Sequence, residues 1–359
     1  MKKWNIVGII AVVALAAMTS YVQAADKLKV GFIYVGPIGD HGWTYQHERG
    51  RLEMMKALDG KVESTYLENV PESADAERAL ERLVQTGHKL IFATSFGYME
   101  SVLKVAKKHP DVMFEHAVGF KRAKNVSTYF VREHEGDFIM GRIAGKMSKS
   151  GTIAFIGTFP VPVVIAGINS YMLGAQSVNP NIKIKIVWTN SWFDPTLEAD
   201  AAKTVIQQGA DVLRTYADSP SIMSTAEQLG VHAFALGSDM SKYGPKAQLT
   251  GEIFHWGGYY TQRAKDVLDG KWTSKDTWGG LHSGMFVMAP YTNMPGDVKK
   301  LAMDTEAAIR SGKLLPFKCP VMNQQGKSVE CKGGDHLDEG QIRSMNWFVK
   351  GIDAQMPGK

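Results

Sequence analysis

The 359-residue sequence lacks the patterns that mark several common classes of enzyme and nucleotide-binding protein. It contains neither of the glycine-rich motifs GxGxxG and GxxxxGK[ST], and neither of the hydrolase motifs HExxH and GxSxG. The sequence therefore gives no support for a phosphate-binding loop or for the commonest hydrolytic mechanisms. The formal net charge of +5 is too small an excess to indicate binding to nucleic acid or to an acidic membrane surface. With 44% hydrophobic and 21% charged residues, the composition is that of an ordinary globular protein.

The N-terminal residues have the pattern of a secretory signal peptide. Lys2 and Lys3 precede an apolar run over residues 6–18, and small residues ending at Ala24 follow it. The run is short for a membrane span, so cleavage after about Ala24 is expected rather than a retained anchor. No cysteine lies near Ala24 to carry a lipid. We therefore expect a soluble periplasmic protein that begins at about residue 25.

Cysteine is scarce, with only Cys319 and Cys331, which lie twelve positions apart in a polar segment. The spacing is not that of a CxxC pair, and His336 alone does not make a zinc site. In an exported protein we expect these two residues to form a disulfide that closes a surface hairpin. No metal or other cofactor is expected.

Short β-branched or aromatic runs alternate with longer helical patterns from Lys27 onward, which is typical of α/β proteins with parallel sheets. Strands are predicted at 29–35, 63–67, 90–93, 112–116, 127–131, 152–156, 183–188, 212–216, 233–236 and 249–253. Helices are predicted at 41–58, 74–85, 97–107, 137–147, 163–177, 195–208 and 256–269.

The length beyond residue 24 is large for one hydrophobic core and predicts two lobes. A weak internal repeat supports this interpretation. Around both Gly87 and Gly209, the end of a helix is followed by the glycine and then by a buried strand. No linker divides the halves, so short segments must cross between them, and our candidates are residues 129–133, 254–257 and 287–291. The expected division is 25–130 with 257–287 in one lobe and 131–256 with 288–359 in the other.

Ligands of open parallel sheets bind beyond the carboxyl ends of the strands, and several candidate residues follow predicted strands. After the first strand come Asp40, for which a helix N-cap is preferred over a ligand contact, and Trp43, which suits the core and the cleft equally. After the third strand come Ser95, Phe96 and Tyr98, whose hydroxyls and rings suit either packing or a ligand wall.

The second half offers a comparable set. Trp192 lies in the turn before the Asp194-Pro195 helix start, and Asp239 follows the strand at 233–236. Trp43 and Trp192 could clamp a flat ring from the two lobes, while Asp239 accepts a hydrogen bond from the edge of that ring. A helix cap is the alternative for Asp239, and hinge packing is as good an interpretation of Trp256 as a ligand wall.

Two other groups of polar residues are interpreted as structural. Glu115-His116 and the run from Arg132 to Glu135 could be imagined as a general base or a metal site. Buried, hydrogen-bonded histidines account for both more simply.

The sequence resembles the basic membrane protein family, the substrate-binding components of ABC importers, which include bacterial purine-nucleoside receptors. The motifs that carry the resemblance are Val30-Gly-Phe-Ile-Tyr-Val-Gly36, Gly39-Asp-His-Gly-Trp43, Ala93-Thr-Ser-Phe-Gly97, Gly141-Arg-Ile-Ala-Gly145, Leu173-Gly-Ala-Gln-Ser-Val-Asn-Pro180, Gly209-Ala-Asp211 and Gly237-Ser-Asp239.

The resemblance implies a type I periplasmic-binding fold of two Rossmann-like lobes joined by three crossings, with the ligand between them. It also implies that Trp43 and Trp192 match the aromatic residues that stack on the base, and that Asp239 matches an acidic ligand-contacting position. Nucleoside binders carry a lysine for the sugar near the last crossing, where this chain has Phe254-His255-Trp256. This departure favours a free base such as adenine over a nucleoside.

The expected function is a monomeric binding protein that delivers a purine to the permease and ATPase of an ABC importer, without catalysis. A periplasmic nucleoside-processing enzyme and a sensory protein that presents its ligand to a membrane receptor are the alternatives. A repressor of the related two-lobed type is disfavoured by export and by the lack of an N-terminal DNA-binding segment.

Overall fold

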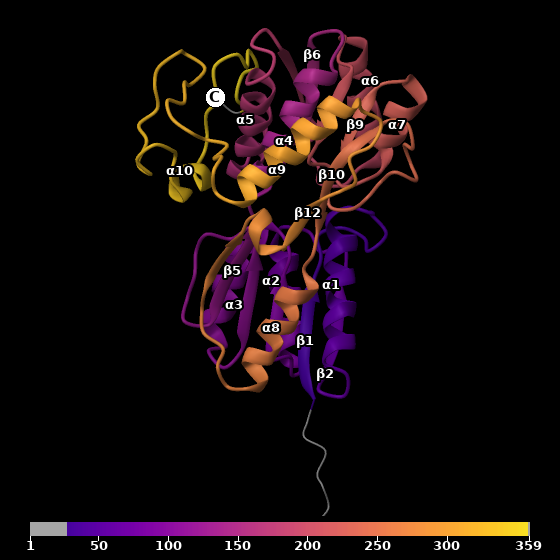
Figure 1. Cartoon of the computed structure of the whole chain (residues 1–359). Coiled ribbons are helices and arrows are strands. Elements are labelled where there is room, and N and C mark those ends of the chain that lie inside the picture. The colour runs from indigo at the N-terminus through magenta and orange to yellow at the C-terminus, as the bar shows by residue number, and fades with distance from the viewer. Residues whose placement is uncertain (1–26, 358–359) are drawn as a thin grey trace, which may run out of the picture.

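The computed structural model describes residues 27–357, which fold into two lobes, each built on a parallel or mostly parallel sheet (Figure 1). The predicted signal peptide, residues 1–24, lies outside the described residues. No helix within residues 27–357 is long and apolar enough to cross a membrane. The fold class is α/β, as the sequence predicted.

The N-terminal lobe, residues 28–131 and 257–279, contains a sheet with strand order β11-β5-β4-β3-β1-β2, in which neighbouring strands are parallel. Its strands are β1 (Leu28–Ile33), β2 (Val62–Leu67), β3 (Leu90–Ala93), β4 (Met113–Ala117), β5 (Val126–Val131) and β11 (Asp276–Gly279). Its helices are α1 (Trp43–Ala57), α2 (Ala74–Gln85), α3 (Met99–Lys108) and α8 (Gly257–Leu268), with a 3-10 turn at η1 (Phe96–Tyr98).

The C-terminal lobe, residues 133–254 and 286–357, repeats this plan with strand order β12-β10-β9-β8-β6-β7, and only β12 is antiparallel to its neighbour. Its strands are β6 (Thr152–Gly157), β7 (Lys183–Trp188), β8 (Val212–Thr215), β9 (His232–Ala235), β10 (Gln248–Phe254) and β12 (Phe286–Met288). Its helices are α4 (Glu133–Met147), α5 (Pro162–Gln176), α6 (Pro195–Gln207), α7 (Ser221–Leu229), α9 (Gly296–Arg310) and α10 (Glu339–Arg343).

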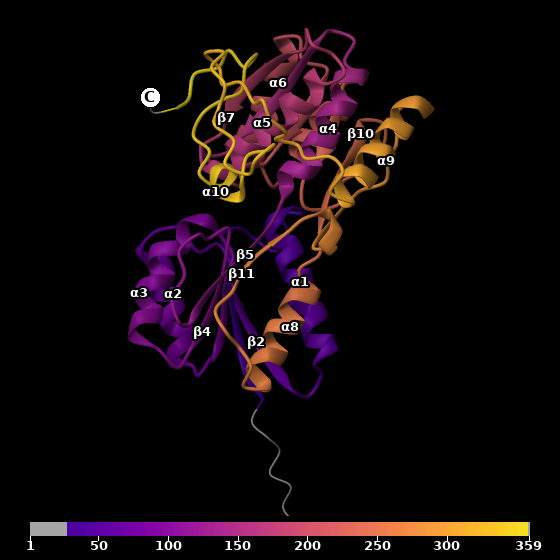
Figure 2. The same ribbon diagram turned by 60° about the vertical axis from the view of Figure 1, so that its left-hand side comes forward.

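Alternation along the strands divides each lobe's apolar residues between the two faces of its sheet. In β1, Phe32 belongs to the same buried cluster as Met54 of α1 and Tyr260 of α8, whereas the next residue, Ile33, belongs to the cluster that contains Leu80 of α2. Helices therefore cover both faces of the sheet, as Figure 2 shows. This covering explains why the strands read as nearly continuous apolar runs in the sequence.

The chain passes between the sheets three times, after β5, after β10 and after β11. The first two passages lie where the sequence analysis placed its candidates. The third includes the short turn η2 (Leu281–Ser283) and comes before β12, rather than at residues 287–291. Residues 286–288 therefore lie in the second sheet, because β12 pairs with β10.

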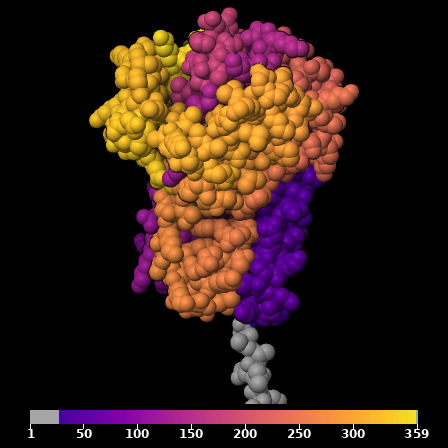
Figure 3. Space-filling model, viewed as in Figure 1, coloured from indigo at the N-terminus to yellow at the C-terminus, as the bar shows by residue number. Residues whose placement is uncertain are grey.

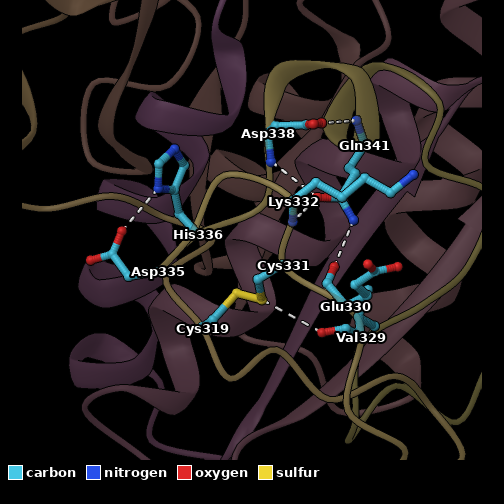
Figure 4. The surroundings of a disulfide bond; sticks show 9 residues. All are labelled: Cys319, Val329, Glu330, Cys331, Lys332, Asp335, His336, Asp338 and Gln341. Carbon is cyan, nitrogen blue, oxygen red and sulfur yellow. Dashed lines mark hydrogen bonds and ion pairs between the residues drawn. A yellow bond between two sulfur atoms is a disulfide. The ribbon is translucent and has the colours of Figure 1, made fainter.

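Cys319 and Cys331 form a disulfide in the segment that follows α9. The loop between them folds back as a hairpin, in which the Val329 N–H donates to the Val321 carbonyl at 2.8 Å. The predicted pairing is therefore present in the structure (Figure 4).

Candidate functional site

A cavity of about 450 Å³ lies where the carboxyl ends of strands from both sheets face each other. From the N-terminal lobe it is lined by Val35, Trp43, Ser95, Phe96, Val118 and Phe130, and from the C-terminal lobe by Glu133, Val163, Trp192, Tyr216, Asp218 and Leu236. We call it the interlobe cavity. Its position is the one expected for a ligand site of open parallel sheets.

Trp43 begins α1 and is held at the cavity wall on several sides. Its indole N–H donates to the Thr94 carbonyl at 2.6 Å. Its ring makes edge contacts with Phe254 at 5.6 Å and with Trp256 at 5.7 Å between centroids. These contacts fix the orientation of a side chain that remains partly exposed to the cavity.

Trp192 reaches the same cavity from the turn between β7 and α6. Its carbonyl accepts a hydrogen bond from the Asp218 N–H at 3.0 Å, and its ring packs on Phe159 at 5.1 Å. Its indole N–H donates to Glu72 of the N-terminal lobe at 3.1 Å, a contact that joins the two lobes. The structure thus brings the two tryptophans singled out in the sequence into one cavity.

Two buried carboxyls, Asp218 and Glu133, provide the acidic groups of this cavity. One Asp218 carboxylate oxygen accepts a hydrogen bond from the backbone N–H of Trp43 at 3.3 Å. Burial raises the pKa of Asp218 well above its usual range, and the charges of Asp40 and Glu198 raise it further. Burial also raises the pKa of Glu133 to about 8.

Neither carboxyl was predicted from the sequence to be a ligand-binding residue. Asp218 follows β8 in the same way that Trp192 follows β7, so the rule on strand ends could have found it. Glu133 belonged to a run that was interpreted as structural, because nothing in the sequence shows which residue of a helix start faces a cleft.

Asp239 is not among the residues that line the interlobe cavity, contrary to expectation. It lies exposed in a separate polar hollow with Lys242 and His255, and its carboxylate accepts from the Ser241 N–H and from Gln248, at 2.9 and 2.8 Å. The cause is the turn at Gly237, whose φ of 77° directs the chain away after Leu236. Leu236 therefore lines the cavity in place of Asp239.

Asp40 serves as a cap rather than as part of the cavity lining. It is fully buried, and its carboxylate accepts from the N–H groups of Gly42, Thr44 and Tyr45, each at 2.9 Å. Asp40 thus satisfies N–H groups in the first turn of α1, as a capping side chain does, but the N-cap residue itself is Gly42, so the predicted position of the N-cap is wrong.

Tyr98 and Trp256 belong to the core of the protein. Tyr98 is buried and donates to the Val70 carbonyl at 2.5 Å. Trp256 is buried with its ring stacked on His47 at 4.9 Å. Neither lines the interlobe cavity, because both rings face the interior of the N-terminal lobe.

Ser95 and Phe96 do line the cavity, on the turn after β3. The Ser95 hydroxyl donates to Glu72 at 2.5 Å, so it is already engaged within the protein. Phe96 is partly exposed and supplies an apolar ring. Residues 27–357 contain no group of three or more His, Cys, Asp or Glu side chains arranged to hold a metal ion.

Residues 27–312 match the family model described as ABC transporter substrate-binding protein, PnrA-like. The chain belongs to this family. It is the basic membrane protein family that the sequence motifs resembled, so the resemblance is confirmed. The described residues have the type I periplasmic-binding fold.

Two proteins are similar to this chain in sequence, and a solved structure is similar to it in fold. The chain is 53% identical over 349 residues to a purine-binding protein of Brucella abortus, covering 97% of this chain and 99% of that one. It is 31% identical to a putative ABC transporter glucose-binding protein of Haloferax volcanii, covering 92% and 82%. The structure of an ABC transporter solute-binding protein from Aeropyrum pernix superposes with a TM-score of 0.70 at 18% identity, covering 89% and 98%.

Proposed function

We propose that this protein is the periplasmic binding component of an ABC importer and that it carries a purine base, adenine or a close analogue, in the interlobe cavity. The observation that carries the proposal is the presence of two indoles and two buried carboxyls in one mostly apolar cavity between the lobes. The 53% identity to a purine-binding protein over nearly the whole chain supports the same ligand class.

The cavity suits a flat heteroaromatic ligand better than a sugar. A sugar presents hydroxyls on all sides and needs many polar partners, whereas most of this lining is apolar. Of its polar side chains, Ser95 is engaged with Glu72, and the Tyr216 hydroxyl donates to Asp137 at 2.6 Å. A planar base can instead bury both faces against rings and apolar side chains while Asp218 and Glu133 contact its edge.

The same lining favours a free base over a nucleoside. No lysine or arginine is among the residues that line the interlobe cavity. A ribose would add three hydroxyls and find few free partners. We therefore expect adenosine to bind more weakly than adenine.

Calorimetry tests the proposal directly. Protein freed of any co-purified molecule by unfolding and refolding is titrated with adenine, hypoxanthine, adenosine and glucose. We expect one purine base per chain and no heat from glucose. Purine bases without measurable affinity, or glucose as the tighter ligand, would overturn the purine assignment. Chromatography of adenosine after incubation with the protein tests for the enzymatic alternative, because cleavage would release free adenine.

A further inference from the structure

The chain continues beyond residue 312, where the family match ends, and this C-terminal segment reaches the ligand cleft. A second hollow of about 530 Å³ adjoins the interlobe cavity and shares lining residues with it, among them Phe130 and Glu133. Its wall includes Ile342 and Arg343 of α10. The space between the lobes is thus bounded in part by a helix outside the matched region.

The C-terminal segment is fastened to the C-terminal lobe. Asn169 of α5 donates to the Trp347 carbonyl at 2.7 Å and accepts from the Val349 N–H at 3.0 Å, and the side chain of Ile352 is fully buried. Gln341 of α10 donates to the Glu330 carbonyl at 2.7 Å, beside the disulfide (Figure 4). The helix α10 must therefore move together with the C-terminal lobe.

The same helix also holds the N-terminal lobe. Arg343 forms an ion pair of 2.7 Å with Asp276, the first residue of β11, and its guanidinium lies 4.5 Å from the centre of the Trp278 ring. The other Asp276 oxygen accepts from the Thr128 hydroxyl at 2.8 Å, which fixes the carboxylate in place. Arg132, near the first crossing, pairs with Glu339 of α10.

These contacts form a connection between the lobes in addition to the three chain crossings. In the space-filling view, the yellow C-terminal residues cover one side of the upper lobe and reach its boundary with the lower lobe (Figure 3). The crossings are covalent and persist when the lobes hinge apart, whereas the pair between Arg343 and Asp276 must break if β11 moves away from α10.

We infer that α10 is a latch, in which Arg343 holds Asp276 across the cleft and slows the opening of the lobes and the release of the ligand. The ligand's identity rests on the proposed function, but the latch rests on these contacts alone. The pair is about a quarter to a third exposed, so its strength depends on salt.

Stopped-flow dissociation of adenine tests the latch with Arg343→Gln, which removes the charge and keeps most of the side chain. The matched control is Arg78→Gln, because Arg78 pairs with Asp75 within the single helix α2. We expect Arg343→Gln to release adenine about three- to tenfold faster, from the loss of one ion pair and one cation–π contact, and Arg78→Gln to match the parent. Added salt should speed release from the parent protein and change release from Arg343→Gln much less.

Small-angle scattering of the ligand-free protein separates the latch from the ligand assignment. The latch predicts a larger radius of gyration for Arg343→Gln, and for the second variant Asp276→Asn, with thermal unfolding unchanged. If both variants scatter like the parent protein, and release adenine at its rate where adenine binds, the latch is refuted. A parent protein that binds no purine would refute the proposed function, while the scattering comparison would still decide the latch.

Discussion

The two tryptophans of the cavity use their only hydrogen-bond donors on the protein itself. The indole N–H of Trp43 is bound to Thr94 and that of Trp192 to Glu72. Neither ring can therefore donate to a ligand without giving up a contact within the protein. What each can offer is an apolar ring surface, so we expect stacking and exclusion of water to account for its role.

Replacement of Trp43 or Trp192 by alanine should each weaken purine binding by about 1–3 kcal/mol, or roughly 5- to 150-fold in Kd. Titration calorimetry measures the change. Trp192→Phe keeps an aromatic ring and loses only the N–H bond to Glu72, so it should retain most of the affinity. If Trp192→Phe weakened binding as much as Trp192→Ala, the hydrogen bond rather than stacking would be the cause.

Glu133 should make the stability of the ligand-free protein depend on pH. Burial holds its pKa at about 8, above the value of about 4.5 expected in the unfolded chain. Between these values the folded carboxyl keeps its proton and the unfolded one loses it, so the free energy of unfolding falls as pH rises from about 4.5 to 8. Glu133→Gln should remove this contribution, on the order of a few kcal/mol, and make the profile less steep.

Urea unfolding between pH 5 and 9 measures that profile. Glu330→Gln is a suitable control, because Glu330 is exposed on the disulfide loop and should leave the slope unchanged. An equal slope in the parent protein and Glu133→Gln would show that Glu133 does not hold its proton in the folded state.

The contrast between Trp192 and Asp239 shows which site residues a sequence can predict. Trp192 lies four residues after the end of β7, and the rule that ligands bind at strand ends predicted its place at the cavity. Asp239 also lies four residues after the end of its strand, β9, but the turn with positive φ at Gly237 comes between them, and Asp239 does not line the cavity. A turn's direction depends on a few dihedral angles and on what it packs against, so the motif Gly237-Ser-Asp239 alone did not reveal it.

At the scale of elements, α4 and α5 pack closely because each has glycines facing the other. A Cβ atom on Gly141 of α4 would lie 2.0 Å from the Tyr171 carbonyl oxygen, and one on Gly174 of α5 would lie 2.3 Å from that of Phe138. The two backbones therefore approach more closely than side chains would allow. This contact gives a physical reason for Gly141 in the motif Gly141-Arg-Ile-Ala-Gly145.

Gly141→Ala should destabilise the protein by about 1–3 kcal/mol or more, because the added methyl group forces the two helices apart. In an open helix position, replacing glycine by alanine stabilises the helix by up to about 1 kcal/mol, so a loss of stability here would be opposite to the effect of helix propensity. Gly258→Ala in α8 is the matched control, since its Cβ would meet no atom within 4 Å. Chemical unfolding should show the control at or above the parent stability, and a stabilising Gly141→Ala would contradict the close contact.

The sequence predicted the ten strands β1 to β10 within about two residues at their ends, but it did not predict β11, β12, α7, α9 or α10. Strands such as β3 are continuous apolar runs, so they are easily recognised in the sequence. The strands β11 and β12 have four and three residues and form at the sheet edges through tertiary contacts. The five-residue helix α10 depends on its capping box and on packing against α5, so it has too little periodicity to detect.

At the scale of the whole molecule, the lobes touch through backbone near the cavity. A Cβ atom on Gly42, at the start of α1, would lie 2.5 Å from the Asp218 carbonyl oxygen of the other lobe. Gly237 faces the same point, where its Cβ would lie 2.8 Å from the Gly42 carbonyl carbon. These glycines let the lobes approach closely enough to enclose the cavity.

Gly42→Ala should hold the lobes apart without damage to either core. Its Cβ would collide with Asp218, and its backbone, at φ −114° and ψ −117°, lies outside the regions that alanine prefers, so both effects disfavour this arrangement of the lobes. We expect weaker purine binding and a larger radius of gyration with ligand present, measured by calorimetry and small-angle scattering. Gly39→Ala lies in the same turn, and its Cβ would meet no atom within 4 Å, so it should behave like the parent protein. Because both lobes keep their own sheets and cores, thermal unfolding should change little in either variant, and a large fall for Gly42→Ala would mean that the lobes depend on each other to fold.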